Sequence, residues 1–180
     1  VSASAITATL TTLIMGVLSD RVGKRKAFIV AGYILWGISV LAFGYITPEA
    51  MESFFPGSTA AAAAAIGVVA MDCLMTFFGS TANDAAFNAW LTDSTDASNR
   101  GAAEGINAMM PLVSILVVFG GFMFFDLKES ESWSLIFTII GAVVTLVGVL
   151  GFFIIEEPDV KPSADPYFAT ILYGFRPRTV

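Results

Sequence analysis

Long apolar runs, separated by short polar intervals, predict a chain that crosses a membrane five times. The predicted spans lie at about residues 4–18, 27–46, 59–91, 101–125 and 133–155. An α-helix needs roughly 20 apolar residues to cross the hydrocarbon core of a bilayer. The first run is shorter than this, so we expect the chain to begin inside a span. The third is longer, which predicts a tilted helix or an Ala-rich start that projects beyond the core.

Charged residues occupy the intervals between the runs, and the sign of their charge predicts which side each interval faces. Lys and Arg collect in the cytoplasmic loops of membrane proteins. Alternating sides from the basic interval at residues 19–26 leaves only Lys128, of nine cations, on the outside. We therefore expect the cytoplasmic segments of a multi-pass protein of the cell membrane to be residues 19–26, 92–100 and 156–180.

Composition points to the same class. Hydrophobic residues make up 56% and charged residues 13% of the 180 residues, and the mean hydropathy is +0.79. A soluble domain is rarely so apolar. The absence of histidine excludes imidazole catalysis and most zinc sites. No nucleophile and base pair, metal-ligand cluster or phosphate-binding glycine motif is found. We expect no enzyme activity, no metal, no cofactor and no nucleic-acid partner.

The interval after the first run predicts a tight hairpin between two spans. It contains a carboxylate followed by four cations, and its glycines permit close approach or a sharp turn of the backbone. Its spacing resembles the loop signature of the major facilitator superfamily, Gly-x-Leu-small-Asp-Arg/Lys-x-Gly-Arg/Lys-Arg/Lys. The residues in register are Gly16, Leu18, Ser19, Asp20, Arg21, Gly23, Lys24 and Arg25.

This resemblance implies an all-α membrane protein with a major-facilitator-type helix bundle. The chain would hold part of span 2 through span 6, as a bundle at residues 1–157, followed by a cytoplasmic linker at 158–180. The resemblance also implies that the hairpin gates the cytoplasmic side, with Asp20 contacting the C-terminal half of the same transporter. The expected partners are that half, membrane lipids and a small-molecule solute. Within the linker, Asp165, Pro166 and the apolar residues that follow predict a short amphipathic helix.

Two carboxylates lie inside the third run, where ionisable groups are costly and therefore suggest function. Asp84 lies about eight residues from the next polar interval, about 12 Å deep at 1.5 Å per residue. Asp72 lies nearer the external end. Polar residues recur around Asp84 every fourth position, which predicts either a protein-lined cavity or a buried hydrogen-bond cluster between helices. The candidate binding residues are Thr76, Ser80, Asn83, Asp84 and Asn88, with Asn107 of the next span.

Residues 83–93, followed by Arg100, resemble the corresponding helix of the glycoside-pentoside-hexuronide cation symporters. In that branch an aspartate of the fourth helix serves cation and sugar binding, and Asp84 is the matching position. The interval that follows lacks the additional basic residues common in the branch. Only Asp84 is carried over. In the second span, by contrast, we interpret Gly32, Gly37 and Gly44 as positions of close helix packing.

These observations predict a secondary active transporter that moves a small solute, with a sugar as the candidate, by ion-coupled alternating access. A proton-coupled mechanism would titrate Asp84. A sodium-coupled mechanism would keep Asp84 ionised, with Asn83, Ser80 or Thr76 as further ligands, and the sequence does not choose between the two. The alternatives are a lipid or lysolipid transporter of a related branch, and a membrane scaffold or receptor that keeps the fold without transport.

Overall fold

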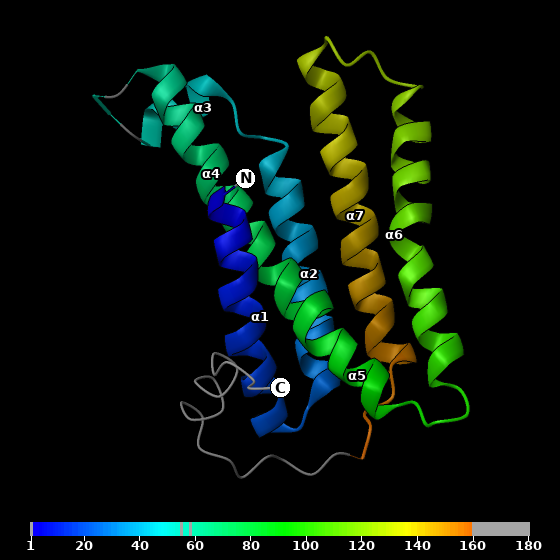
Figure 1. The fold of residues 1–180 in the computed structure, drawn as a ribbon. Coiled ribbons are helices and arrows are strands. Elements are labelled where there is room, and N and C mark those ends of the chain that lie inside the picture. The colour runs from blue at the N-terminus through cyan, green and yellow to red at the C-terminus, as the bar shows by residue number, and fades with distance from the viewer. Residues whose placement is uncertain (1, 55, 58, 160–180) are drawn as a thin grey trace.

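The computed structural model describes residues 2–54, 56–57 and 59–159, and every regular element in them is a helix (Figure 1). Five helical segments in this part of the chain are long and apolar enough to cross a membrane, which confirms the predicted number of spans. Four are single helices: α1 (Ser2–Val22), α2 (Arg25–Phe43), α6 (Arg100–Phe122) and α7 (Ser130–Ile154). The fifth joins three elements, α4 (Ala60–Gly79), η1 (Ser80–Phe87) and α5 (Asn88–Asp93).

Most helix ends lie beyond the predicted apolar runs. α1 has 21 residues and extends past both ends of the predicted apolar run at residues 4–18. It continues through Asp20 and Arg21, and α2 already begins at Arg25. Helices can extend past the hydrocarbon core because the headgroup region on either side solvates charged side chains. α7 likewise begins at Ser130, before its predicted start, and α6 ends at Phe122, so the interval between them lies at residues 123–129 where 126–132 was predicted.

The interval between the second and third predicted spans, which we expected to be an external loop, contains a short helix, α3 (Pro48–Phe54). The Thr47 hydroxyl accepts a hydrogen bond from the Ala50 N–H at 3.2 Å, as the side chain of a helix N-cap does. Proline is favoured at the first helical position because the missing N–H would have no partner there. The pair Thr47 and Pro48 is therefore a helix start signal that the interpretation of this segment as a loop missed.

Only Gly23 and Lys24 separate α1 from α2, which confirms the predicted tight hairpin. Gly23 has a φ of 65°, and its N–H donates to the Ser19 carbonyl at 2.9 Å. This left-handed conformation is the usual way to end a helix, and a side chain would strain it.

We therefore expect Gly23→Ala to destabilise the protein by about 1 kcal/mol, the usual penalty of a Cβ in the left-handed region. Thermal unfolding of the purified full-length protein in detergent would measure this. The matched control is Gly105→Ala on α6, because a Cβ at this helical position meets no described atom within 4 Å. The control should be neutral or stabilising by up to about 1 kcal/mol. Equal effects of the two substitutions would contradict the role of the turn.

Glycines bring α2 and α7 into close contact, as predicted for the second span. A Cβ on Gly37 would lie 2.8 Å from the carbonyl oxygen of Gly141, and one on Gly148 would lie 2.8 Å from the backbone nitrogen of Ile34. The Ser134 hydroxyl donates to the Gly44 carbonyl at 2.6 Å. Small residues allow membrane helices to approach closely enough for backbone contacts of this kind.

The core is built around α2, which packs against α7 and against the α4–η1 segment. α1 packs against the α4–η1 segment, and α6 stands at the edge of the bundle (Figure 1). α6 has no buried residue in the described part of the chain. Its ring contact to α7 joins Phe122 and Trp133, whose centroids are 6.1 Å apart. The amphipathic helix predicted in the linker falls within residues 160–180, which lie outside the described residues.

Candidate functional site

Three of the six predicted binding residues, Ser80, Asn83 and Asp84, lie on a π-helix, η1, where the sequence indicated an ordinary α-helix. In a π-helix each N–H bonds to the carbonyl five residues earlier, so the chain rotates by a smaller angle per residue than it does in an α-helix. η1 buries Ala82, Ala85 and Ala86, and leaves Asn83 and Asp84 exposed. A Cβ on Gly32 would lie 2.7 Å from the Ala82 Cβ, so small residues bring α2 and η1 together. Short π-helical segments are frequent at functional sites.

The structure brings four of the six predicted binding residues to one open cavity of about 290 Å³, which they line together with residues of α4 and with Trp36 of α2. The indole of Trp36 lies against Gly79, where a Cβ would be 3.1 Å from its Cε2 atom. In the described residues no group of three His, Cys, Asp or Glu side chains is placed to hold a metal ion. The full lining consists of Trp36, Asp72, Met75, Thr76, Gly79, Ser80, Asn83 and Asp84.

A chain of two hydrogen bonds orients Asp84. The Tyr33 hydroxyl donates to Asn83 Oδ1 at 3.2 Å, and Asn83 Nδ2 donates to Asp84 Oδ1 at 3.1 Å. The Asn83 amide thus turns its NH₂ toward Asp84 and its oxygen toward Tyr33. Asn83 is therefore better placed to orient Asp84 than to offer its oxygen to sodium. Sequence reasoning missed Tyr33, whose single polar side-chain atom lies within an apolar run.

Asn88 and Asn107 are not in the lining of this cavity. Asn88 Nδ2 donates to the backbone carbonyl of Asp84 at 3.2 Å, and Asn107 Nδ2 makes a long contact of 3.5 Å with Asn88 Oδ1. The two amides thus link α6 to α5, one turn further along the chain than Asp84. Their role in binding stays a prediction.

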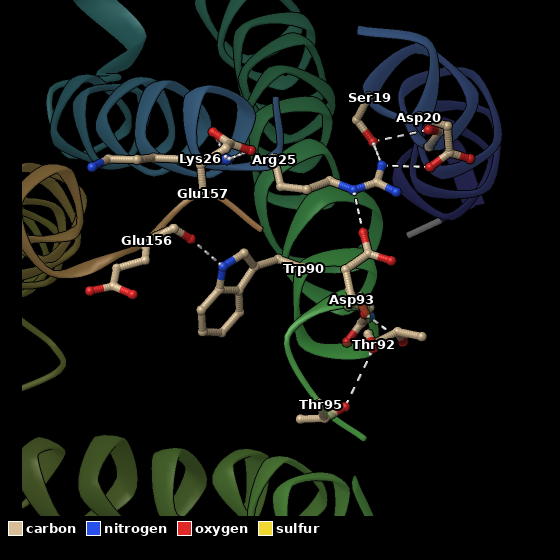
Figure 2. Close-up of polar contacts among 12 residues, drawn as sticks. Ser19, Asp20, Arg25, Lys26, Trp90, Thr92, Asp93, Thr95, Glu156 and Glu157 are labelled. Carbon is tan, nitrogen blue, oxygen red and sulfur yellow. Dashed lines mark hydrogen bonds and ion pairs between the residues drawn. The ribbon is translucent and has the colours of Figure 1, made fainter. Parts of the chain in front are cut away.

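The predicted basic hairpin is organised around Arg25, whose side chain is only 6% exposed. Its Nη1 atom lies 2.5 Å from Asp20 Oδ1 and donates to the Ser19 hydroxyl at 2.7 Å, while its Nε donates to Asp93 Oδ2 at 2.9 Å. Figure 2 shows the guanidinium between groups of α1 and α5. One buried cation therefore joins three helices. The sequence indicated Arg25 as a member of the basic cluster, but it did not indicate Ser19 or Asp93 as partners.

Ser19 is fully buried, whereas Gly16, Asp20, Arg21 and Lys24 of the hairpin motif are not. Arg21 and Lys24 are not buried, and no salt bridge joins either to a described residue. The prediction that Gly16 allows close helix approach is not met within the described residues, where a Cβ added to it would meet no atom within 4 Å. Asp20 keeps 45% of its side chain exposed despite its bond to Arg25. The exposed motif residues are thus available to a further segment.

The chain that follows α7 is attached to the same end of the bundle (Figure 2). Both carboxylate oxygens of Glu157 lie 3.3 Å from the Lys26 backbone nitrogen in the first turn of α2, where Lys24 supplies no side-chain cap. A carboxylate there satisfies a free N–H and interacts favourably with the helix dipole. The Trp90 indole N–H donates to the Glu156 carbonyl at 2.9 Å. These contacts tie α7 to α2 and α5.

The interval between α5 and α6 is a compact turn held by polar contacts. The Ser98 hydroxyl and N–H donate to Asp96 Oδ1 at 2.5 and 2.7 Å, and these bonds lower the pKa of the exposed Asp96 carboxyl. Arg100 donates to the carbonyls of Thr92 and Thr95 at 2.8 and 3.0 Å. Arg100 therefore connects the end of α5 to the start of α6.

In the comparison with known proteins, one family model matches a part of the chain that contains both the cavity and the hairpin. The family model described as Major Facilitator Superfamily matches residues 1–177 and therefore includes both. No curated protein gives a significant match to the chain. No solved structure does so either.

Proposed function

Because the chain belongs to the major facilitator superfamily of membrane transporters, we propose that it is part of a secondary active transporter that moves a small solute by ion-coupled alternating access. It is an integral, multi-pass membrane protein. The observation that carries the proposal is the open cavity beside Asp84. A carboxylate inside a span is costly unless it binds a partner. No described Lys or Arg forms an ion pair with Asp84, so we assign the neutralising role to the coupling ion.

The coupling ion we propose is a proton or sodium, and the solute to test first is a sugar. Asp84 serves either ion, as a titrating group or as an ionised ligand. The hydroxyls of Thr76 and Ser80 line the same cavity and are oxygen ligands suited to sodium. The sugar follows from the resemblance of residues 83–93 to the symporter branch. The expected orientation in the cell membrane places residues 19–26, 92–100 and 156–180 on the cytoplasmic side.

The basic hairpin supports a second part of the proposal, closure of the cytoplasmic side against the C-terminal half of the transporter. Arg25 fixes the ends of α1, α2 and α5 as one unit. The exposed carboxylate of Asp20 and the open face at Gly16 then form a surface for the other half. Halves of this kind rock around a midplane site during transport.

The test is uptake by the full-length protein in proteoliposomes, with sugars screened against imposed proton and sodium gradients. We expect Asp84→Asn to reduce uphill accumulation to the level of protein-free vesicles, because the coupling ion loses its charged ligand. Downhill exchange of solute should persist. The matched control is Glu52→Gln, which removes an exposed carboxylate of α3 outside the cavity lining and should leave accumulation unchanged. Native accumulation by Asp84→Asn would show that Asp84 is not the coupling residue.

The same vesicles separate the alternatives. A lipid or lysolipid transporter would move a labelled lysolipid between leaflets while no ion gradient drives a sugar. A scaffold or receptor would move neither. Because the family consists of transporters, an enzyme activity is not proposed.

A further inference from the structure

Tyr33 of α2 is linked to the Asp84 carboxylate by hydrogen bonds, although it does not line the cavity. Its hydroxyl donates to Asn83, and the Asn83 amide donates to Asp84 Oδ1. No other described residue forms a hydrogen bond or an ion pair with the Asp84 side chain. The orientation of this carboxylate therefore depends on one amide, and Tyr33 is the other partner of that amide.

The Asn83 amide needs a partner at each end to stay in one orientation. Its carbonyl oxygen accepts hydrogen bonds and its NH₂ group donates them, although the two ends have nearly the same shape. The terminal torsion of an asparagine side chain has broad minima, so the amide is fixed only by the groups that its two ends bind. With its oxygen held by Tyr33, the amide keeps its NH₂ group toward Asp84.

Tyr33 is itself held in place by close neighbours. Gly148 of α7 lies so near that a Cβ added to it would be 3.0 Å from the Tyr33 Cβ. On α2, the rings of Tyr33 and Trp36 have centroids 5.8 Å apart. Both contacts involve the carbon skeleton of Tyr33, and neither involves its hydroxyl. Replacing Tyr33 by phenylalanine would therefore remove the link to Asn83 and leave the packing in place.

The two oxygens of the Asp84 carboxylate have different surroundings. Oδ1 accepts the Asn83 N–H at 3.1 Å, whereas Oδ2 forms no hydrogen bond or ion pair with a described residue. One oxygen thus fixes the carboxylate, and the other is left for a ligand. A group that is already fixed in its binding orientation loses less conformational freedom on binding, which raises affinity.

We propose that Tyr33 is a positioning residue for ion coupling, which acts through Asn83 to hold the Asp84 carboxylate in the orientation that receives the coupling ion. The proposal rests on the transport function proposed above and assigns a role in it to a residue outside the cavity lining. Tyr33 contacts neither the ion nor the solute. Its effect is on the affinity of Asp84 for the ion.

The first test reads Asp84 directly and needs no transported solute. Infrared difference spectra of the full-length protein, recorded between acidic and alkaline buffer, contain the bands of the carboxyl groups that titrate. The bands of Asp84 are identified by their loss in Asp84→Asn. We expect Tyr33→Phe and Asn83→Ala each to shift the Asp84 carboxylate band. The Tyr33→Phe, Asn83→Ala double variant should shift it no further than Asn83→Ala alone, because Tyr33 acts through Asn83.

The second test separates positioning from a general loss of structure. In the proteoliposome assay, we expect Tyr33→Phe to raise the sodium concentration that gives half-maximal uptake about threefold to tenfold, the effect of one hydrogen bond. If protons drive uptake, the pH profile should shift by the corresponding amount, about half a pH unit to one pH unit. The maximal rate and the KM for the solute at saturating ion should stay as in the native protein. A structural role would change these as well.

The matched control is Tyr45→Phe. Tyr45 lies just beyond the end of α2, is 65% exposed, and forms no side-chain hydrogen bond with a described residue. Its loss of a hydroxyl should leave both the infrared bands of Asp84 and the ion dependence of uptake unchanged.

Two outcomes would overturn the role of Tyr33 while the transport proposal stands. One is a native Asp84 band in Tyr33→Phe. The other is a native ion dependence of uptake in Tyr33→Phe, together with loss of accumulation in Asp84→Asn. Native accumulation by Asp84→Asn would instead contradict the transport proposal itself, and the assignment of Tyr33 to ion coupling with it.

Discussion

Arg25→Met is expected to destabilise the protein by about 3 kcal/mol, at the low end of the range for removing one partner of a buried ion pair. The loss leaves the buried Ser19 hydroxyl without its donor and the Asp93 carboxylate, with a side chain 23% exposed, without its cation. The partial exposure of Asp20 and Asp93 allows some rehydration, which is why the low end applies. Thermal unfolding of the full-length protein in detergent is the measurement.

Arg21→Met is the matched control for this prediction. Arg21 lies in the same hairpin and has the same charge, but it is exposed and forms no salt bridge with a described residue. Surface substitutions of this kind change stability by about 0.5 kcal/mol or less. Arg25→Lys should fall between the two, because an ammonium keeps the charge but cannot reproduce the fork that reaches α1 and α5 together. Equal melting temperatures for Arg25→Met and Arg21→Met would contradict the buried network.

Gly37→Ala is expected to destabilise the protein by about 1–3 kcal/mol, the range for overpacking a well-packed interface. The new Cβ would lie 2.5 Å from the backbone nitrogen of Thr145 and 2.8 Å from the carbonyl oxygen of Gly141. Both atoms belong to the main chain of α7, so no change of side-chain rotamer can relieve the overlap. The helices must separate, and contacts along the whole α2–α7 interface would weaken.

Two further variants show whether the backbone contact is the cause. Thr145→Ala should not rescue Gly37→Ala, since it leaves the main-chain atoms in place. Gly105→Ala, on α6, meets no described atom within 4 Å and should stabilise the protein by up to about 1 kcal/mol through better helix propensity. Melting curves of these variants and the native protein in the same detergent compare the effects directly. Rescue by Thr145→Ala would instead assign the cost to the side chain.

The sequence by itself determined the five spans, the hairpin and the position of Asp84 within a span. These features follow from local rules, because a bilayer requires long apolar helices and places charges at their ends. The hairpin could be predicted from Gly23 and its neighbours in the sequence alone. The glycines of α2 likewise indicated close helix packing. The polar stripe that begins on α4 was also readable, although which of its residues share a cavity was not.

Only the tertiary structure decided which polar groups meet. Asp93 lies 68 residues beyond Arg25, and Tyr33 lies 50 residues before Asn83, so neither contact has a local signal. The π-helix at η1, which packs against α1 and α2, also had no signal in the sequence, where the α-helix is the usual conformation. Asn88 and Asn107 lie outside the cavity lining, which the sequence pattern did not indicate. Local pattern determines how each helix crosses the bilayer, whereas the packing of neighbouring helices determines which side chains form the site.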